Sequence, residues 1–342
     1  MTWQRCVCVE ATGLVTSVGL SAASTCAAIR AKLSNAAQTR LVPADEGWLV
    51  AHQVALEQPW RGLDKLASMA AMAIDECLEA VSSCERPVIP LLLCVAEPQR
   101  AGRIDDLDRR LFDRVGQWTG LGKSDGSGVI AQGRPGLITA LHRARALLRS
   151  GRASRVLLAG TDSLLTWPVY RAYLDQQRLL TPLNSDGLML GEAAGALLLT
   201  AGSGPSLRLC GIGTGIEPAK VDSGMPLRAQ GLKSAIEAAL AEAGVALHQM
   251  DWRVTDLSGE HYYFKEAALA VGRLLRAHKE SFELWHPAQS VGETGAAAGF
   301  VGVAVADAAY RKAYAPGPWV LVHLGNDEGQ RAAAVFGYGS VR

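Results

Sequence analysis

The side chains most able to act as nucleophiles or metal ligands are the seven cysteines. An odd number cannot all pair as disulfides, and Cys6 and Cys8 lie too close together for the paired CxxC spacing of a zinc site. Most of the cysteines lie in apolar segments, where a free cysteine behaves as a small hydrophobic residue. The cysteines therefore predict a protein of the reducing cytoplasm that holds no metal.

Serine and glycine motifs give no catalytic signature either. Neither Gly126-Ser127-Gly128 nor the segment GTDSL at residues 160–164 has the GxSxG pattern of a hydrolase nucleophile. The glycines at 211 and 213 are followed by Thr-Gly-Ile-Glu, without the Lys-Ser/Thr pair of a phosphate-binding loop. We therefore expect no bound cofactor.

Composition excludes two classes of partner. The 342 residues include 34 Lys and Arg and 33 Asp and Glu, a net charge of +1, which gives no electrostatic reason to bind nucleic acid or an anionic membrane. The apolar runs at residues 88–96 and 295–306 fall far short of the roughly 20 residues of a membrane span. Residues 1–19 have no sustained apolar stretch, so no signal peptide is expected.

Apolar runs alternate with helical patterns along the chain, which indicates an α/β protein. The spacing predicts helices over residues 21–33, 63–81, 137–149 and 297–314. Strands are expected at residues 6–10, 88–95, 156–160 and 319–324. Residues 11–19 and 126–136 are expected to be glycine-containing loops.

A weak internal repeat divides the chain. The helix at 137–149 and the strand at 156–160 are mirrored by the helix at 297–314 and the strand at 319–324, and residues 6–13 have a faint echo at 207–214. The length corresponds to roughly two domains. We therefore predict two similar halves, residues 1–203 and 204–342, joined near the AGSGP segment and sharing one core.

Three segments resemble the ketosynthase branch of the thiolase superfamily. Within residues 157–199 the matching positions keep the order and spacing of the family: Gly160, Ser163, Pro182, Asp186, Gly187, Gly191, Glu192 and Gly195. Residues 9–29 and 291–306 are similar to the opening of the family and to the start of its second-half helix. The resemblance implies an α/β thiolase-like fold of two related halves, layered α-β-α-β-α, and a dimer.

The family condenses acyl units with a cysteine at the N-terminus of the first-half helix and two histidines from the second half. The resemblance places the cysteine position at Arg134, or at Gln132 with a shift of two residues. It places the histidine positions at Asp256 and Glu293. No catalytic residue is thus expected to be intact, and the glycine-rich loop that gates the family's pocket is reduced to residues 325–329.

These positions leave alternatives open. Gln132 resembles the glutamine that replaces the nucleophile in decarboxylating domains and chain-length subunits, but a polar loop residue before a helix is the commoner explanation. Asp256 and Glu293 would be an acid/base pair if both faced the old pocket. An inert ion pair with Arg134, filling the vacated site, is favoured over that reading.

We therefore hypothesise a catalytically degenerate ketosynthase homologue, not an enzyme, that acts through a protein partner. The partner would be a second thiolase-like subunit or an effector of bacterial type VI secretion, for which the protein would be an accessory or chaperone-like factor. The alternative is an acyltransferase related to β-ketoacyl-acyl-carrier-protein synthase, or a chain-length-factor-like subunit, in contact with an acyl carrier protein.

Overall fold

Two five-stranded halves with mirrored order make up one mixed sheet in the computed structural model, which describes residues 6–39, 49–202 and 206–339. The strands of the first half, from the seam outward, are β1 (Cys6–Val15), β7 (Glu192–Gly202), β6 (Arg155–Ser163), β4 (Leu91–Val95) and β5 (Gly128–Ala131). Those of the second half are β8 (Leu207–Ile216), β12 (Gln330–Tyr338), β11 (Trp319–Gly325), β9 (Trp252–Thr255) and β10 (Glu283–Trp285).

Strand directions are mirrored as well. In each half the first three strands are antiparallel neighbours, whereas the outer pairings, β6–β4–β5 and β11–β9–β10, are parallel. The two halves meet where β1 pairs antiparallel with β8. The fold is thus two related halves, and the echo between residues 6–13 and 207–214 corresponds to the two seam strands. The predicted boundary at 203/204 lies outside the described residues.

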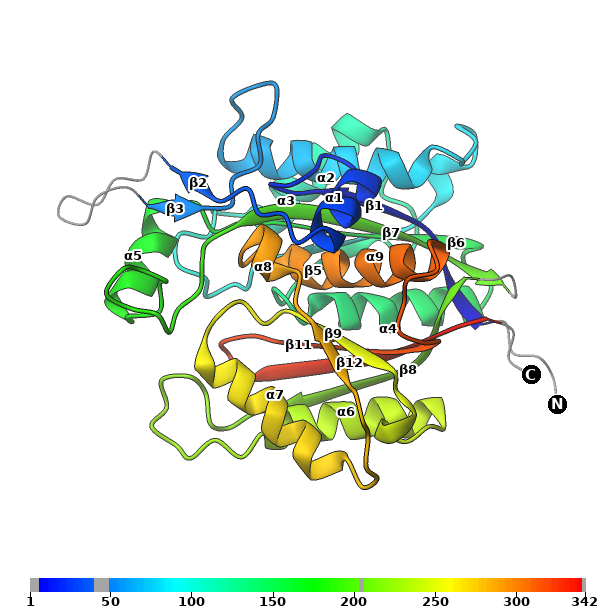
Figure 1. Ribbon diagram of the computed structural model, residues 1–342. Coiled ribbons are helices and arrows are strands. Elements are labelled where there is room, and N and C mark those ends of the chain that lie inside the picture. The colour runs from blue at the N-terminus through cyan, green and yellow to red at the C-terminus, as the bar shows by residue number, and fades with distance from the viewer. Residues whose placement is uncertain (1–5, 40–48, 203–205, 340–342) are drawn as a thin grey trace.

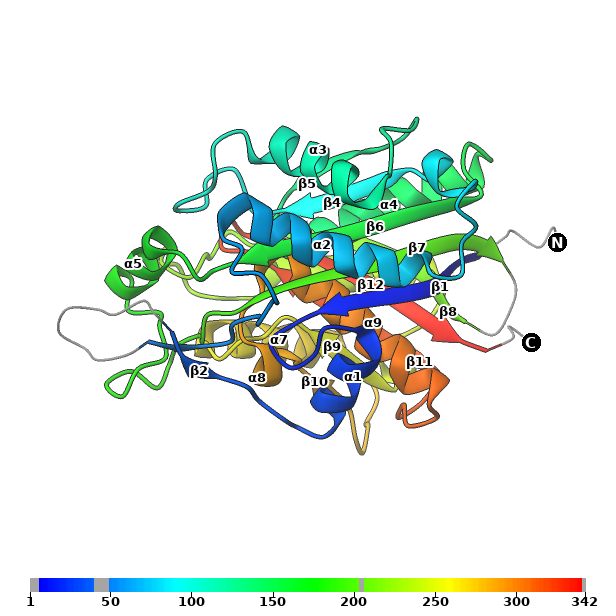
Figure 2. The ribbon, with the colours of Figure 1, turned by 90° about the horizontal axis from the view of Figure 1, so that it is seen from above.

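Helices form three layers with the two halves of the sheet between them (Figure 1). The outer layer on the first half contains α2 (Gly62–Leu78) and α3 (Leu107–Thr119), and Figure 2 shows α2 lying along β1 and β7. The middle layer contains α4 (Gly136–Arg149) and α9 (Ala298–Arg311), and the outer layer on the second half contains α6 (Gln230–Ala243) and α7 (His261–Leu274). This is the predicted α-β-α-β-α layering.

The remaining elements are short. They are α1 (Ala22–Arg30), α5 (Trp167–Asp175), α8 (Ala288–Val291) and the two-stranded sheet of β2 (Ala37–Gln38) and β3 (Val50–Ala51), with 3-10 turns at Arg86–Val88, Leu247–Gln249 and Gly295–Ala297. No helix within the described residues is both long enough and apolar enough to cross a membrane.

Alternation along the strands explains the layers. On β11, Val320, Val322 and Leu324 pack into the central core with α4 and α9, whereas Leu321 packs into the outer core with α6. Because successive side chains point to opposite faces of a strand, a strand with apolar side chains on both faces must be covered on both faces. Central strands of this kind require the five-layer arrangement.

Most of the expected elements are present, with three differences. β1 runs on to Val15, so the loop expected at 11–19 is mostly strand. The loop expected at 126–136 contains the edge strand β5, and the strand expected at 88–95 begins at Leu91, after a 3-10 turn. The helices expected at 63–81, 137–149 and 297–314 are α2, α4 and α9, with ends shifted by up to three residues.

Three of the residues that carry the family resemblance pack or hydrogen-bond in the core. A Cβ on Gly160 would lie 2.4 Å from Phe300 Cε2, and one on Gly195 would lie 2.5 Å from Phe300 Cβ, so both glycines let α9 approach the first half. The carboxylate of Glu192 is buried and accepts hydrogen bonds from Val54 N (2.8 Å) and Ser163 Oγ (2.7 Å).

Candidate functional site

The predicted site residues lie at strand ends and at the start of α9, and three of them meet there. Gln132 and Arg134 follow β5, Asp256 follows β9, and Glu293 lies between α8 and the turn that opens α9. β5 and β9 are parallel to their neighbours, and the carboxyl ends of parallel strands are where α/β sheets gather functional side chains.

Arg134 contacts both predicted carboxylates. Its Nη1 donates to Glu293 Oε2 at 2.8 Å, and its Nε lies 3.5 Å from Asp256 Oδ2. All three side chains are buried. Each carboxylate also accepts a hydrogen bond from a backbone amide. Gly295 N donates to Glu293 and Gly325 N donates to Asp256, each at 2.9 Å.

Gln132 stands apart from this cluster. Its Oε1 accepts a hydrogen bond from Thr139 Oγ1 on α4 at 2.6 Å, and its backbone oxygen accepts one from Asn326 Nδ2 at 3.3 Å. The side chain is therefore held against the helix that follows it. Of the two positions considered for the nucleophile, Arg134 is the one in contact with Asp256 and Glu293.

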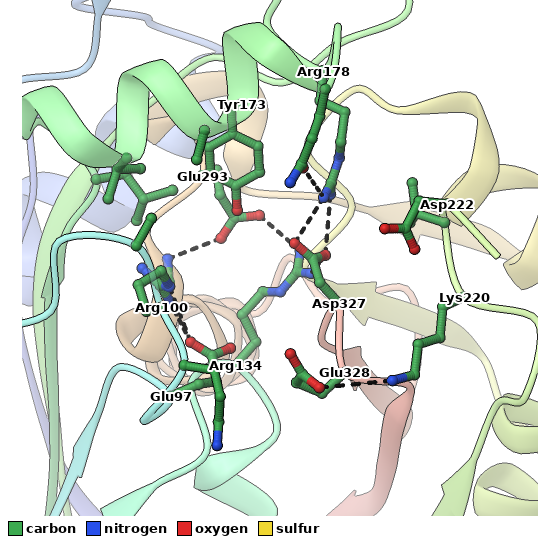
Figure 3. A pocket seen from close by; sticks show the side chains of 18 residues that line it. Glu97, Arg100, Arg134, Tyr173, Arg178, Lys220, Asp222, Glu293, Asp327 and Glu328 are labelled. Atoms are coloured by element: carbon green, nitrogen blue, oxygen red, sulfur yellow. Dashed lines mark hydrogen bonds and ion pairs between the residues drawn. The ribbon is translucent and has the colours of Figure 1, made fainter.

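Asp327, on the loop between β11 and β12, extends the network. It accepts hydrogen bonds from Arg178 Nη1 (2.8 Å) and Nη2 (3.0 Å), from Arg134 Nη2 (3.4 Å) and from the hydroxyl of Tyr263. Arg178 also forms a two-bond pair with the buried carboxylate of Glu260, at 2.6 and 3.0 Å. Figure 3 shows Asp327 between the two arginines.

Sequence reasoning did not identify Arg178, Glu260 or Asp327 as members of this site. Tyr263 is likewise absent from the residues that the sequence predicts for the site, and residues 325–329 enter only as a reduced gating loop. The one local signal is that residue 327 follows the strand predicted at 319–324, which ends at the same edge of the sheet as Asp256. Nothing in the sequence near Arg178 indicates that it reaches this edge.

Burial and charge act in opposite directions on the carboxyl groups. Burial raises the pKa values of Glu293 and Asp256 above their ordinary range, although the Arg134 guanidinium opposes the shift. Burial also acts to raise the pKa of Asp327, but hydrogen bonds from Arg178 and the charge of Arg134 outweigh it, and that pKa lies well below its ordinary value. The carboxylate of Asp327 is thus the firmly ionised one.

Arg134 itself stays cationic. Burial acts to lower its pKa, but the carboxylates of Glu293 and Asp256 and the phenol of Tyr263 raise it well above the usual value. Its guanidinium also lies 5.0 Å from the centroid of the Tyr263 ring. A permanently protonated guanidinium has no lone pair with which to attack a carbonyl.

A pocket of about 300 Å³ opens above these ion pairs. Arg134, Glu293 and Asp327 line it together with Tyr173 of α5, and Lys220 lies 3.7 Å from Glu328 across the same pocket (Figure 3). Among the described residues that line it there is no cysteine and no histidine. Within the described part of the chain, no cluster of His, Cys, Asp and Glu has the arrangement of a metal site.

The thiol of Cys94 and the imidazole of His52 are buried outside this pocket. Cys94 lies on β4 beneath the start of α4, where burial raises the pKa of its thiol far above the ordinary value. His52 lies beside Gly292, and burial lowers its pKa to about 4. Neither group belongs to the lining of the pocket.

No protein-family model matches the sequence, and no curated protein matches it. The structure is similar to a chain of a type II polyketide synthase complex, in which an acyl-carrier protein is bound to its ketosynthase carrying the hexaketide. The identity is 15%, the TM-score is 0.80, and the match covers 98% of this chain and 100% of that one.

Two further solved structures give similar values. The ishigamide ketosynthase/chain length factor matches at 15% identity and a TM-score of 0.79, over 98% of this chain and 100% of that one. A ketosynthase in complex with its chain length factor from Xenorhabdus doucetiae matches at 14% identity and a TM-score of 0.73, over 99% of both chains. The chain therefore has the thiolase-like fold of ketosynthases and chain length factors.

Proposed function

We propose that this protein is a non-condensing subunit of the chain-length-factor kind, which works as the partner of a ketosynthase. The observation that carries the proposal is the bonding of Arg134 to Glu293 and Asp256 at the start of α4. In the proposal these three residues occupy the positions of the family's nucleophile and its two histidines.

The charges at this site are the reverse of what condensation needs. A condensing site requires a thiolate that accepts the acyl group and hydrogen-bond donors that stabilise the developing enolate. Here the nucleophile position carries a cation, and the two donor positions carry carboxyl groups, whose negative charge would repel an enolate. Arg134 and its partners therefore serve the packing of the subunit.

The structural similarities favour a synthase partner. The proteins of similar fold described above are complexes of a ketosynthase with its acyl-carrier protein or with its chain length factor. They support a heteromeric assembly with a ketosynthase, and contact with an acyl carrier protein, over the type VI secretion effector considered first. None of these structures supports the effector reading.

Two measurements test the proposal. The chain is incubated with acyl-acyl-carrier protein and acyl-coenzyme A beside a cysteine-containing ketosynthase as the positive control, and the intact masses are compared. We expect an acyl adduct on the ketosynthase and none on this chain. A stable adduct on this chain would establish an acyltransferase and overturn the proposal.

The second measurement concerns the partner. The chain is co-expressed in turn with each ketosynthase, carrier protein or secretion effector encoded near its gene, and size-exclusion chromatography is expected to show a stoichiometric complex with a ketosynthase. Separate elution of the two proteins, or a stoichiometric complex with a secretion effector instead, would refute the assignment.

A further inference from the structure

The seam between the two halves contains two cysteines that face each other across neighbouring strands. Val7 of β1 pairs with Leu209 of β8, and Cys8 pairs with Arg208. Continuing this antiparallel register by one step places Cys6 opposite Cys210, which is the bulge residue of β8 in its pairing with β12 on the other side. Both cysteines are half-buried.

Their side chains share one face of the sheet. Val7 and Leu209 are both buried in the central core beside α4 and α9. Because side chains alternate along a strand, Cys6 points to the opposite, outer face, and Cys210, at the bulge of β8, packs on the outer face as well. Cys210 packs there against the core beneath α6, and the charges of Cys6 and Cys8 contribute to its environment.

The spacing suits a disulfide. Residues directly opposite on antiparallel strands have Cα atoms about 4.5–5.5 Å apart, and a disulfide spans Cα separations of roughly 4.4–6.8 Å. Cys8 is the competitor, but it is buried and its Sγ contacts the backbone oxygen of Gly202 at 3.4 Å, on the strand away from β8.

We propose that Cys6 and Cys210 form a reversible disulfide that joins the two halves of the sheet across the β1–β8 seam. This pair is a site of thiol modification independent of the pocket and of the proposed function. The oxidant is a small disulfide such as oxidised glutathione. It would act on a seam that two residue pairs hold together among the described residues.

The reaction is thiol–disulfide exchange in two steps. The Cys6 thiolate attacks a sulfur of the oxidised glutathione, which breaks its S–S bond and releases one glutathione thiolate. The Cys210 thiolate then attacks the Cys6 sulfur of the mixed disulfide, forms the Cys6–Cys210 bond and releases the second glutathione. The two thiol protons end on the two glutathione molecules, and two electrons pass to the oxidant.

The order of attack follows from the surroundings of the thiols. Burial raises the pKa of Cys210 to about 11, and the neighbouring Cys6 thiol adds to the shift. Cys210 is therefore expected to be the resolving residue rather than the one that attacks the oxidant first.

The test uses the full chain with Cys84→Ser, which removes an exposed cysteine outside the seam. After incubation with oxidised glutathione, we expect the intact mass to fall by two hydrogen atoms. Peptide mapping without reduction should show a disulfide between the peptide that contains Cys6 and the peptide that contains Cys210. Dithiothreitol should restore the original mass.

Single variants identify the partners, because Cys6 and Cys8 share one peptide. Adding Cys6→Ser or Cys210→Ser should abolish the crosslink and leave only glutathione adducts, whereas adding Cys8→Ser should preserve it. Glutathione adducts alone in the Cys84→Ser protein would overturn the proposal. A crosslink that survives Cys6→Ser but is lost with Cys8→Ser would overturn it as well.

Discussion

At the residue scale, Arg134 is the side chain on which the site depends. It is buried and bonded to Glu293, and it neighbours Asp256 and Asp327. Removing one partner of a buried ion pair leaves an uncompensated charge, which costs far more than the pair itself contributes. We expect Arg134→Met to lower the free energy of unfolding by about 3–5 kcal/mol in urea titrations.

Two comparisons make this prediction specific. The variant Arg171→Met breaks an exposed pair with Asp175 on α5 and should cost less than about 1 kcal/mol. The double variant Arg134→Met/Glu293→Gln removes both charges and should be more stable than Arg134→Met alone. Equal losses of unfolding free energy in Arg134→Met and Arg171→Met would show that the buried ion pairs stabilise the fold no more than an exposed pair does.

A second residue-scale prediction concerns His323 on β11. Burial, together with the charge of Arg253, lowers the pKa of His323 to about 3 from 6.5. Its Nε2 has no hydrogen-bond partner among the described residues. As the pH falls from about 6.5 to 3, His323 binds a proton in the unfolded chain but stays neutral in the folded chain. The free energy of unfolding therefore falls with pH over this range.

Replacing His323 by Gln should remove this contribution. The slope of unfolding free energy against pH, measured by urea titration between pH 4 and 6, should decrease by about 1.4 kcal/mol per pH unit. The matched control His142→Gln changes an exposed histidine of α4. Parallel slopes for wild type and His323→Gln would contradict the assignment.

At the scale of the elements, the approach of α9 to the first half depends on glycine. A Cβ on Gly160 would lie 2.4 Å from Phe300 Cε2 and 2.7 Å from the backbone oxygen of Ala296. Overpacking a tight core costs roughly 1–3 kcal/mol, so Gly160→Ala should lower unfolding stability by at least that much. Urea denaturation of the wild type and of Gly160→Ala measures this difference in the free energy of unfolding.

The control is another glycine-to-alanine change. In α7, a Cβ on Gly272 would meet nothing within 4 Å, and its helical backbone accepts alanine, so Gly272→Ala should raise stability by up to about 1 kcal/mol. Phe300→Leu should reduce the cost of Gly160→Ala, because the two residues are in contact. Additive effects in the double variant would argue against the contact.

Helices and strands are predicted correctly where apolar residues recur at a regular spacing. The prediction fails where a bulge or a close helix–strand contact breaks that spacing. The helix at 137–149 has a regular apolar face, and α4 occupies it. The predicted strand stops at residue 10, whereas β1 continues to Val15. A bulge between Val9 and Ala11 shifts the alternation of side chains between the two faces, so the sequence pattern breaks there. Gly13, expected in a loop, is a strand residue whose Cβ would lie 2.0 Å from the backbone oxygen of Ala73 on α2.

The same contrast holds for the site. Arg134, Asp256 and Glu293 are predicted from positions that the family resemblance implies, and the structure places these three side chains in contact. Arg178 and Asp327 were not found, because their meeting depends on how a loop after α5 and the loop after β11 approach each other. No local spacing in the sequence encodes that approach.

At the scale of the whole molecule, the two halves share one central layer. The central core contains Leu158 of β6 and Leu197 of β7 together with Val322 of β11, and α4 and α9 lie between the two halves of the sheet. Each half alone would expose the apolar faces that the shared layer buries. We therefore predict that the chain unfolds as a single cooperative unit rather than as two domains.

Phe300 tests this cooperativity. It belongs to α9 of the second half, is completely buried, and lies against Gly160 and Gly195 of the first half. Phe300→Ala should cost about 3–5 kcal/mol, and hydrogen exchange should report the same loss for β6 in the first half and β11 in the second. A loss confined to one half, or two separate calorimetric transitions, would mean that the halves fold independently. Coincident losses would mean that a partner that binds either half stabilises the whole chain.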